Sequence, residues 1–241
     1  MEFKPNKLTS CKSINKISEF VSYIEEIKDS YLQQNNHNDF LFRGQNKDFE
    51  LKPKILRYPS RTNNLKLTEK IMIKEFNRFL PLAFDGHITD NEWQILTAAQ
   101  HYGLPTRFLD WSYSSLIALW FAVHNNKEVG FVYIFITKKH KIWDAWEKYS
   151  TPIKVKKTVL YRPSVISDRV RMQNSVFSVQ PLDDDEISSK NTTDYEIKKI
   201  TIENCVGIEK DLQMFGVNAY TVYPELEGLC SNLQKRYFKD V

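Results

Sequence analysis

The sequence contains few cysteines, and their arrangement excludes two common ways of holding a small domain together. The three cysteines, Cys11, Cys205 and Cys230, are odd in number, far apart in the chain and without CxxC spacing. Neither a disulfide framework nor a structural zinc site is therefore indicated. Scattered free thiols are typical of a reducing compartment, so we expect the protein to be cytoplasmic.

Long hydrophobic runs are also missing. The longest, from Leu116 to Val123, is far shorter than the roughly 20 apolar residues that span a bilayer. The first residues, MEFKPNKLTSCKS, include no apolar core of a secretion signal. We therefore expect no membrane association and no signal peptide. No internal repeat or low-complexity tract is present either.

Charge of one sign is not in large excess. The formal net charge is +4 and the sequence pI is near 8.7, which suits an anionic ligand but is explained as well by ordinary solubility. Trp143 and Trp146 stand among lysines, a pattern that fits either core packing or contact with nucleic acid. The GxSxG motif is absent and no cysteine lies near His101 in the sequence, which disfavours a serine hydrolase or a cysteine protease.

The chain does contain enough apolar residues, 41% of 241, for one substantial core. Helical periodicity comes first and is followed by mixed strands and helices, so we expect an α+β fold in a single domain over 1–241. Its parts are an N-terminal helix in 1–36, a core in 37–180, and a C-terminal strand and helices in 181–241. Helices are predicted at 14–31, 67–82, from a cap at Asp90 to Gln100, and at 116–123, 207–215 and 224–237. Strands are predicted at 40–42, 129–137, 159–161, 176–179 and 197–202, and a short strand or turn at 106–111.

The stretch 98–123 holds the most informative residues. Its polar side chains gather in a short, turn-rich segment before a buried helix: Gln100, His101, Arg107, Asp110 and Ser112. Gly103 and Pro105 should end the helix that carries the first two. Either Ser112 or Ser114 can cap the helix that follows. A buried helix explains the apolar run that ends this stretch, but it does not explain the polar cluster.

A second informative site is Arg43-Gly44-Gln45, at the end of the predicted strand 40–42. The arginine can clamp a phosphate or a carboxylate, and the bare backbone of the glycine lets a planar ligand approach closely. The alternative is an arginine in a salt bridge, with a glycine that serves the turn. The tripeptide alone leaves both readings open.

Taken together, these segments resemble the FRG domain, a family named for its (Phe/Tyr)-Arg-Gly motif. The matching segments are Phe42-Arg43-Gly44 with Gln45, QHYGLPTRFLDW from Gln100 to Trp111, ALWFAV, RMQNSVF from Arg171 to Phe177, and YPELEGL from Tyr223 to Leu229. They occur in the family's order over nearly the whole chain. The resemblance implies a bacterial or phage-associated protein.

A more distant resemblance is to the Arg-Ser-Glu class of ADP-ribosyltransferases. It implies N-terminal helices packed on a mixed, ADP-ribosyltransferase-like β-sheet, NAD as the substrate, and no metal. In this scheme Arg43 holds the NAD phosphates or ribose, Gly44 pairs with the nicotinamide amide, and Ser112 takes the Ser/Thr position. Gln173 stands where that class has its catalytic glutamate. A glutamine keeps the hydrogen bond of that glutamate but lacks its negative charge. Either Asp110 or another carboxylate therefore supplies the negative charge, or the site binds NAD without efficient turnover.

We expect two arginines, Arg43 and Arg107, to be anion clamps that converge on one cleft shaped for a dinucleotide, since bidentate guanidinium contacts fix a pyrophosphate better than lysine does. The residues assigned to NAD binding are Arg43, Gly44, Gln45, Gln100, Arg107 and Ser112, and those assigned to catalysis are Arg43, His101, Asp110 and Gln173. His101 would bind ribose or shuttle a proton. The alternative for Gln100, His101 and Asp110 is a buried network that locks the turn, with Asp110 paired to Arg107.

The sequence thus leaves three functions open. The first is an NAD-dependent ADP-ribosyltransferase, a toxin or phage-defence effector that modifies a protein or a nucleic acid. The second is a non-catalytic domain that senses a nucleotide or mediates an interaction. The third is a nucleic-acid-cleaving toxin, which needs clustered carboxylates for a metal. Only the acidic stretch 183–186 offers such a cluster, and a solvated loop explains it as well.

Overall fold

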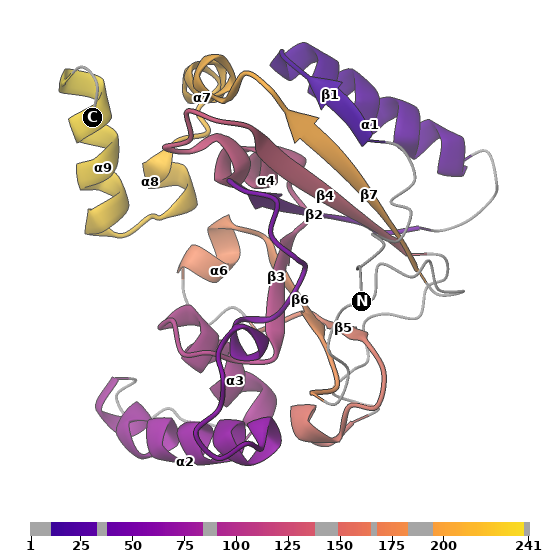
Figure 1. The fold of residues 1–241 in the computed structure, drawn as a ribbon. Coiled ribbons are helices and arrows are strands. Elements are labelled where there is room, and N and C mark those ends of the chain that lie inside the picture. The colour runs from indigo at the N-terminus through magenta and orange to yellow at the C-terminus, as the bar shows by residue number, and fades with distance from the viewer. Residues whose placement is uncertain are drawn as a thin grey trace.

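The computed structural model describes residues 11–32, 38–83, 91–137, 149–164, 168–182 and 195–238. These residues form one mixed sheet of seven strands in the order β1-β7-β4-β2-β3-β6-β5 (Figure 1). The strands are β1 (Cys11–Ile14), β2 (Phe40–Gln45), β3 (Phe108–Ser112), β4 (Gly130–Thr137), β5 (Val159–Tyr161), β6 (Ser175–Val179) and β7 (Tyr195–Ile202). The helices are α1 (Ile17–Leu32), α2 (Leu65–Ala83), α3 (Glu92–His101), α4 (Ser115–Val123), α6 (Asp168–Met172), α7 (Cys205–Met214), α8 (Ala219–Val222) and α9 (Leu226–Tyr237), with 3₁₀ turns η1 (Lys54–Arg57) and η2 (Pro152–Lys154).

The sheet is nearly divided in two between β2 and β3. Strand β2 pairs with β4 along its whole length, and β3 does the same with β6. Between β2 and β3, however, only Phe42 and Ser112 are paired. Figure 1 shows β7, β4 and β2 together on one side of this division, and β3, β6 and β5 on the other. The two central strands therefore leave backbone groups unpaired in the middle of the sheet.

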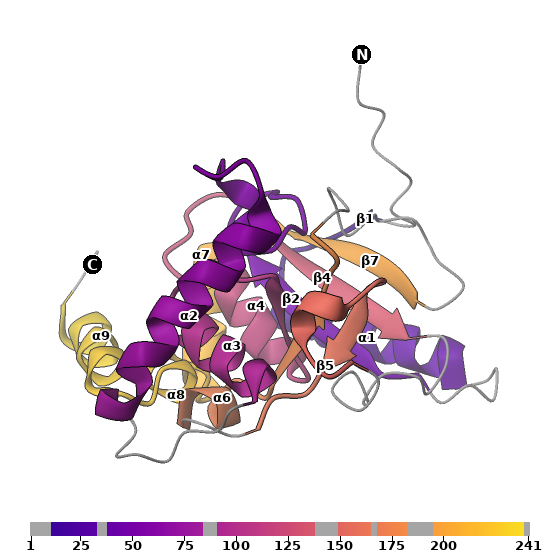
Figure 2. The same ribbon diagram turned by 90° about the horizontal axis from the view of Figure 1, so that it is seen from below.

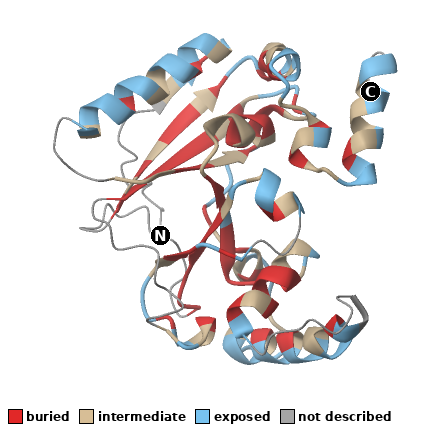
Figure 3. Ribbon diagram, turned by 180° about the vertical axis from the view of Figure 1, so that it is seen from behind, coloured by how far each residue is buried: buried red, intermediate tan, exposed pale blue. Residues whose placement is uncertain are grey.

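Each half of the sheet has its own helical cover. Helices α1, α4 and α7 share a core with the β4 and β7 side, and Trp120 and Leu119 of α4 are fully enclosed there. Helices α2 and α3 share a second core with β3, β5 and β6, in which Trp93, Phe108 and Phe177 stack. Figure 2 shows α2 lying outside α3, and Figure 3 shows that the outward faces of α1, α2 and α9 are the exposed ones.

Glycine at position 44 is required by the close approach of α4 to β2. A Cβ atom built on Gly44 would lie 1.8 Å from the backbone oxygen of Ala118. No side chain fits at that distance, so only glycine lets the helix rest directly on the strand. Helix packing therefore already explains this glycine, although we predicted it for close approach of a ligand.

Most local predictions agree with the structure. Strands β4, β5, β6 and β7 lie where alternation and apolar runs placed them. Helix α3 ends at His101, and Gly103 follows with φ of +83°. Ser114 caps α4 by accepting a hydrogen bond from the amide of Ile117. Local sequence signals were sufficient at these positions because the turn and cap residues act within one helical turn.

Four local predictions need correction. Residues 11–14 form a strand that was not predicted, because Cys11 pairs with Lys199 far along the chain, and the helix predicted from residue 14 begins at Ile17. Helix α3 is capped by Asn91, whose side chain accepts from the amide of Trp93; the predicted cap, Asp90, lies outside the described residues. The short helix α8 was not predicted. Strand β1 precedes α1, so helical structure does not come first in the chain as predicted.

Some predictions fall outside the described residues. These are the tryptophans at 143 and 146 and the acidic stretch 183–186. Within the part of the chain that is described, no helix combines the length and apolar character needed to cross a membrane.

Candidate functional site

A pocket of about 260 Å³ opens where β2 and β3 separate. Its walls come from β2, α3, β3, α4, α6 and the start of β6. The lining residues are Phe42, Arg43, Gly44, Gln100, Asp110, Trp111, Ser112, Ala118, Phe121, Arg169, Gln173 and Ser175. Six of the predicted site residues are among them: Arg43, Gly44, Gln100, Asp110, Ser112 and Gln173. The structure thus brings together residues that are far apart in the sequence.

Arg43 bridges the gap in the sheet. Its Nη1 donates to the backbone oxygen of Asp110 at 2.8 Å and lies 3.8 Å from the Asp110 carboxylate. The guanidinium thereby satisfies a carbonyl that β2 leaves unpaired. Only 16% of the Arg43 side chain is exposed, against 55% for Asp110. Burial lowers the pKa of Arg43 and the carboxylate of Asp110 opposes this, but an arginine remains charged at neutral pH.

Two glutamines hold this charged pair in place. With the Gln45 amide oriented to satisfy both of its atoms, its oxygen accepts from Arg43 Nε at 3.3 Å and its nitrogen donates to the Phe49 carbonyl at 3.2 Å. Gln100 Nε2 donates to Asp110 Oδ2 at 2.9 Å, and its Oε1 accepts from the Thr106 hydroxyl at 2.5 Å. Gln45 is buried behind the arginine and does not line the pocket. Gln100 and Asp110 thus belong to a hydrogen-bond network, as the structural alternative predicts. The cation beside Asp110, however, is Arg43 and not the predicted Arg107.

Arg107 lies away from the pocket, which corrects its predicted place there. Its side chain and that of Glu69 on α2 are fully buried. Arg107 donates to Glu69 Oε2 from Nε at 2.8 Å and from Nη2 at 2.5 Å, and to the Pro152 carbonyl from Nη1 at 3.0 Å. A guanidinium enclosed with its donors engaged in this way is not available to a ligand in the pocket. Instead it ties α2 to the beginning of β3.

Arg169 is the second arginine of the pocket, and it is not among the predicted site residues. It lies on α6, and its guanidinium carbon is 4.5 Å from the centre of the Tyr223 ring. Among the described residues its guanidinium has no hydrogen bond and no carboxylate partner. A half-buried arginine without an anion of its own is suited to receive one from a ligand. No motif indicated it, because α6 reaches the pocket only through the pairing of β6 with β3.

Ser112 and Gln173 line the pocket and are held by hydrogen bonds. The Ser112 hydroxyl donates to the Gln173 carbonyl at 2.7 Å and accepts from the Ser114 amide at 2.9 Å. The Gln173 side chain donates from Nε2 to the carbonyl of Val222 at 3.2 Å. Its Oε1 has no hydrogen bond among the described residues. Ser112 is therefore engaged within the protein, whereas Gln173, which also lines the pocket, keeps one acceptor without a partner among the described residues.

His101 lies next to the pocket but does not line it. Its ring packs edge-on against Tyr102, with the ring centres 5.0 Å apart. Burial lowers the pKa of His101 and so does the positive charge of Arg169, while Glu225 opposes both. We therefore expect a neutral imidazole at pH 7, which can accept or donate one hydrogen bond but cannot clamp an anion by charge.

The arrangement combines two guanidinium groups, one carboxylate, one free amide oxygen and the apolar side chains of Phe42, Ala118 and Phe121. Such a set suits a ligand with both an anionic group and a ring. Among the described residues no three His, Cys, Asp or Glu side chains are placed to hold a metal ion.

Comparison with known proteins gives one match. Residues 38–130 match the model of the FRG domain. No curated protein and no solved structure matches the chain. The matched segment contributes Arg43, Gln100 and Asp110 to the pocket, whereas Arg169 and Gln173 lie beyond it.

Proposed function

Since residues 38–130 match the model of the FRG domain, we propose that the pocket this segment forms together with Arg169 and Gln173 binds NAD, and that the protein is an NAD-dependent ADP-ribosyltransferase. The observation that carries the proposal is the meeting of Arg43, Arg169 and Asp110 in one pocket. The two guanidinium groups bind the diphosphate, and the carboxylate stabilises the positive charge that develops on the ribose.

The size of the pocket supports binding of one end of the dinucleotide. Its volume of about 260 Å³ lies slightly below the roughly 300–1,000 Å³ of pockets that enclose whole small molecules. We therefore place the nicotinamide ring and its ribose inside, against Phe42 and Phe121, and the diphosphate toward Arg169. Gln173 Oε1 accepts a hydrogen bond from a ribose hydroxyl in this pose.

The proposed reaction breaks the bond between the ribose C1′ and the nicotinamide nitrogen. The electron pair of that bond goes to the nicotinamide ring, which leaves as the neutral molecule. The ribose is left with the positive charge of an oxocarbenium-like state, and the Asp110 carboxylate stabilises it. An acceptor nucleophile then adds to C1′ and loses its proton to solvent. An enzyme of this kind suits a toxin or a phage-defence effector acting on a protein or a nucleic acid.

A second candidate is a non-catalytic nucleotide sensor. It is favoured by the state of the pocket's charged groups, because Gln173 is neutral and the Asp110 carboxylate already accepts from Gln100 beside Arg43. A carboxylate neutralised in this way stabilises a cationic ribose less well. The sensor would bind NAD and release no nicotinamide.

One experiment separates these functions. Wild-type protein is incubated with NAD, nicotinamide release is followed by chromatography, and NAD binding is measured by calorimetry. Release together with binding supports the transferase, and biotin-labelled NAD then identifies the acceptor. Saturable binding without release supports the sensor, and absence of both overturns the assignment of NAD to this pocket.

The matched variants are Arg43→Ala and Arg171→Ala. Arg171 is exposed, is not among the pocket's lining residues, and pairs with Asp168 on the surface of the same helix. We expect Arg43→Ala to abolish release and weaken NAD binding, and Arg171→Ala to leave both unchanged. Equal activity in the two variants would show that the reaction occurs elsewhere.

A further inference from the structure

The Arg169 side chain packs against an aromatic ring from the C-terminal part of the chain. Its guanidinium carbon lies 4.5 Å from the centre of the Tyr223 ring, within the range of a cation–π contact. Arginine side chains have many rotamers, and a ligand that must order one loses binding free energy. Contact with a fixed ring keeps the guanidinium in the pocket wall before the ligand arrives.

The Tyr223 ring is itself held by two other aromatic rings. It meets Trp120 and Phe121 of α4 edge to face, with ring centres 5.8 Å and 6.1 Å apart. Phe121 lines the pocket, so the same helix forms part of the pocket wall and supports the ring that contacts Arg169. Burial raises the pKa of Tyr223, and its hydroxyl therefore stays neutral.

The backbone around Tyr223 is fixed by the turn between α8 and α9. A capping box between Asn218 and Thr221 begins α8, and the Val222 carbonyl accepts the hydrogen bond from Gln173. Gly228 of α9 packs against the Tyr223 carbonyl so closely that a Cβ atom there would lie 1.8 Å from its oxygen. The YPELEGL segment, one of those that resemble the FRG family, thus builds the turn that presents Tyr223.

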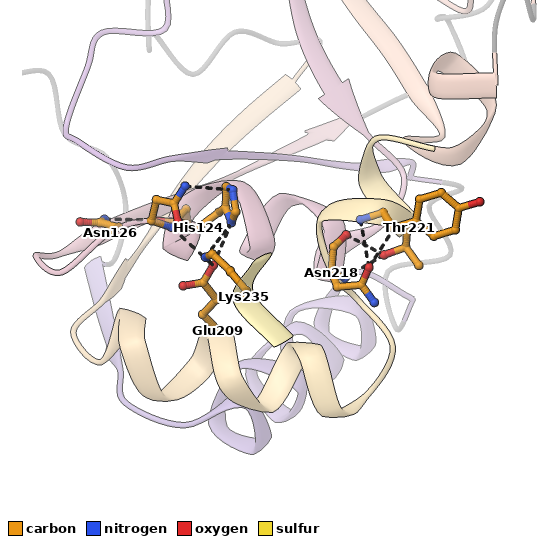
Figure 4. Close-up of polar contacts among 9 residues, drawn as sticks. His124, Asn126, Glu209, Asn218, Thr221 and Lys235 are labelled. Carbon is orange, nitrogen blue, oxygen red and sulfur yellow. Dashed lines mark hydrogen bonds and ion pairs between the residues drawn. The ribbon is translucent and has the colours of Figure 1, made fainter. Parts of the chain in front are cut away.

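Helix α9 is fastened to the body of the protein by a polar cluster, shown in Figure 4. Glu209 on α7 accepts from Lys235 on α9 at 2.5 Å and lies 2.8 Å from His124 Nδ1 at the end of α4. The His124 ring stacks on Trp120, with ring centres 4.0 Å apart. A continuous series of contacts therefore runs from the C-terminal helix through Trp120 to Tyr223 and Arg169.

From this geometry we infer that Tyr223 is a positioning residue for the pocket: its ring holds the Arg169 guanidinium where it binds the diphosphate of the ligand. The inference rests on the proposed function, since it names the part of NAD that Arg169 binds. It also extends the site beyond the segment matched by the FRG model, to the turn between α8 and α9.

The test compares Tyr223→Leu, which removes the ring, with Tyr223→Phe, which keeps it. ADP-ribose, which carries the diphosphate, and nicotinamide, which does not, are titrated separately by calorimetry and by ligand-observed NMR. We expect Tyr223→Leu to weaken ADP-ribose binding by roughly 3- to 30-fold, the range of a cation–π contact. Nicotinamide binding should not change, and Tyr223→Phe should behave as wild type. In an Arg169→Met background, Tyr223→Leu should have no further effect on ADP-ribose.

Each other result has a distinct meaning. Equal ADP-ribose affinity in Tyr223→Leu and wild type overturns the inference and leaves the proposed function intact. Parallel loss of ADP-ribose and nicotinamide binding also overturns it, because the ring would then support the whole pocket and not Arg169 in particular. Wild-type protein that binds neither NAD nor ADP-ribose overturns the proposed function, and the inference with it.

Discussion

Arg43 on β2 donates a hydrogen bond to the backbone oxygen of Asp110 on β3, across a gap where the two strands are not paired. In a continuous sheet the neighbouring strand would supply this donor. The side chain that replaces it brings a positive charge into the gap, and the Asp110 carboxylate lies close by. The gap between the two strands and the charged pocket are therefore one feature of the fold.

The first prediction concerns the shape of the Arg43 side chain. Arg43→Lys keeps the charge but loses the fork that reaches Asp110 through Nη1 and Gln45 through Nε. Because a lysine cannot make both contacts in this geometry, we expect NAD binding to weaken by about 1–3 kcal/mol. Calorimetry on Arg43→Lys and wild type measures this. Unchanged affinity would mean that charge alone serves at this position.

The second prediction separates binding from catalysis at Asp110. Asp110→Asn keeps an oxygen that accepts from Gln100 but removes the negative charge. We expect NAD affinity to change little, while the rate of nicotinamide release falls by about 100-fold, as when one charge-stabilising group is lost elsewhere. Single-turnover release and equilibrium binding are measured on the same preparation. Release at the wild-type rate would exclude Asp110 as the stabilising carboxylate.

The third prediction concerns the buried pair of Glu69 and Arg107. Glu69→Ala leaves the Arg107 guanidinium enclosed without its anion, and we expect a loss of about 3–5 kcal/mol in the free energy of unfolding. Denaturant unfolding measures it. The control is Glu75→Ala, which removes an exposed pair with Arg78 on the same helix and should cost at most about 0.5 kcal/mol. Similar losses in the two variants would contradict the role of the buried pair.

The fourth prediction compares two glycines. Gly44→Ala forces a Cβ against the Ala118 carbonyl, 1.8 Å away, whereas a Cβ at Gly103 meets nothing within 4 Å. Gly103→Ala should cost only about 1–2 kcal/mol, for its left-handed backbone. Gly44→Ala should cost more, because α4 must move away from β2, and should also weaken NAD binding. Thermal unfolding ranks the two, and the opposite order would contradict the close packing of α4.

The fifth prediction concerns the dependence of stability on pH through Glu209. Burial alone would raise the pKa of Glu209, but hydrogen bonds from His124 and Lys235 outweigh burial and lower it from the ordinary value of 4.5. A carboxylate with a lowered native pKa contributes stability above its unfolded pKa and loses it as the pH falls through the native value. Unfolding free energies between pH 7 and pH 3 should therefore fall less steeply in Glu209→Gln than in wild type. Parallel curves would show that this cluster contributes nothing to acid sensitivity.

Sequence reasoning worked best where a signal acts over short distances. The end of α3 before Gly103 and the cap at Ser114 are set by residues within one turn, and β4 is an apolar run long enough to be recognised alone. It failed at β1, which exists only because β7 pairs with it. Residues 11–14 carry no pattern of their own that distinguishes a strand from the start of a helix.

The candidate site follows the same division. The sequence by itself grouped Arg43, Gly44, Gln100, Asp110 and Gln173, which stand in segments that resemble the FRG family. The more distant resemblance to ADP-ribosyltransferases added Ser112 to this group. Only the tertiary structure decided which second arginine joins them. Arg107 follows the turn after α3 in the sequence, but its side chain is buried in an ion pair with Glu69. Arg169 lies at the pocket because β6, which follows α6, pairs with β3. A buried guanidinium requires an anion from the protein, and which arginine receives one depends on how α2 packs, a long-range contact that no local pattern records.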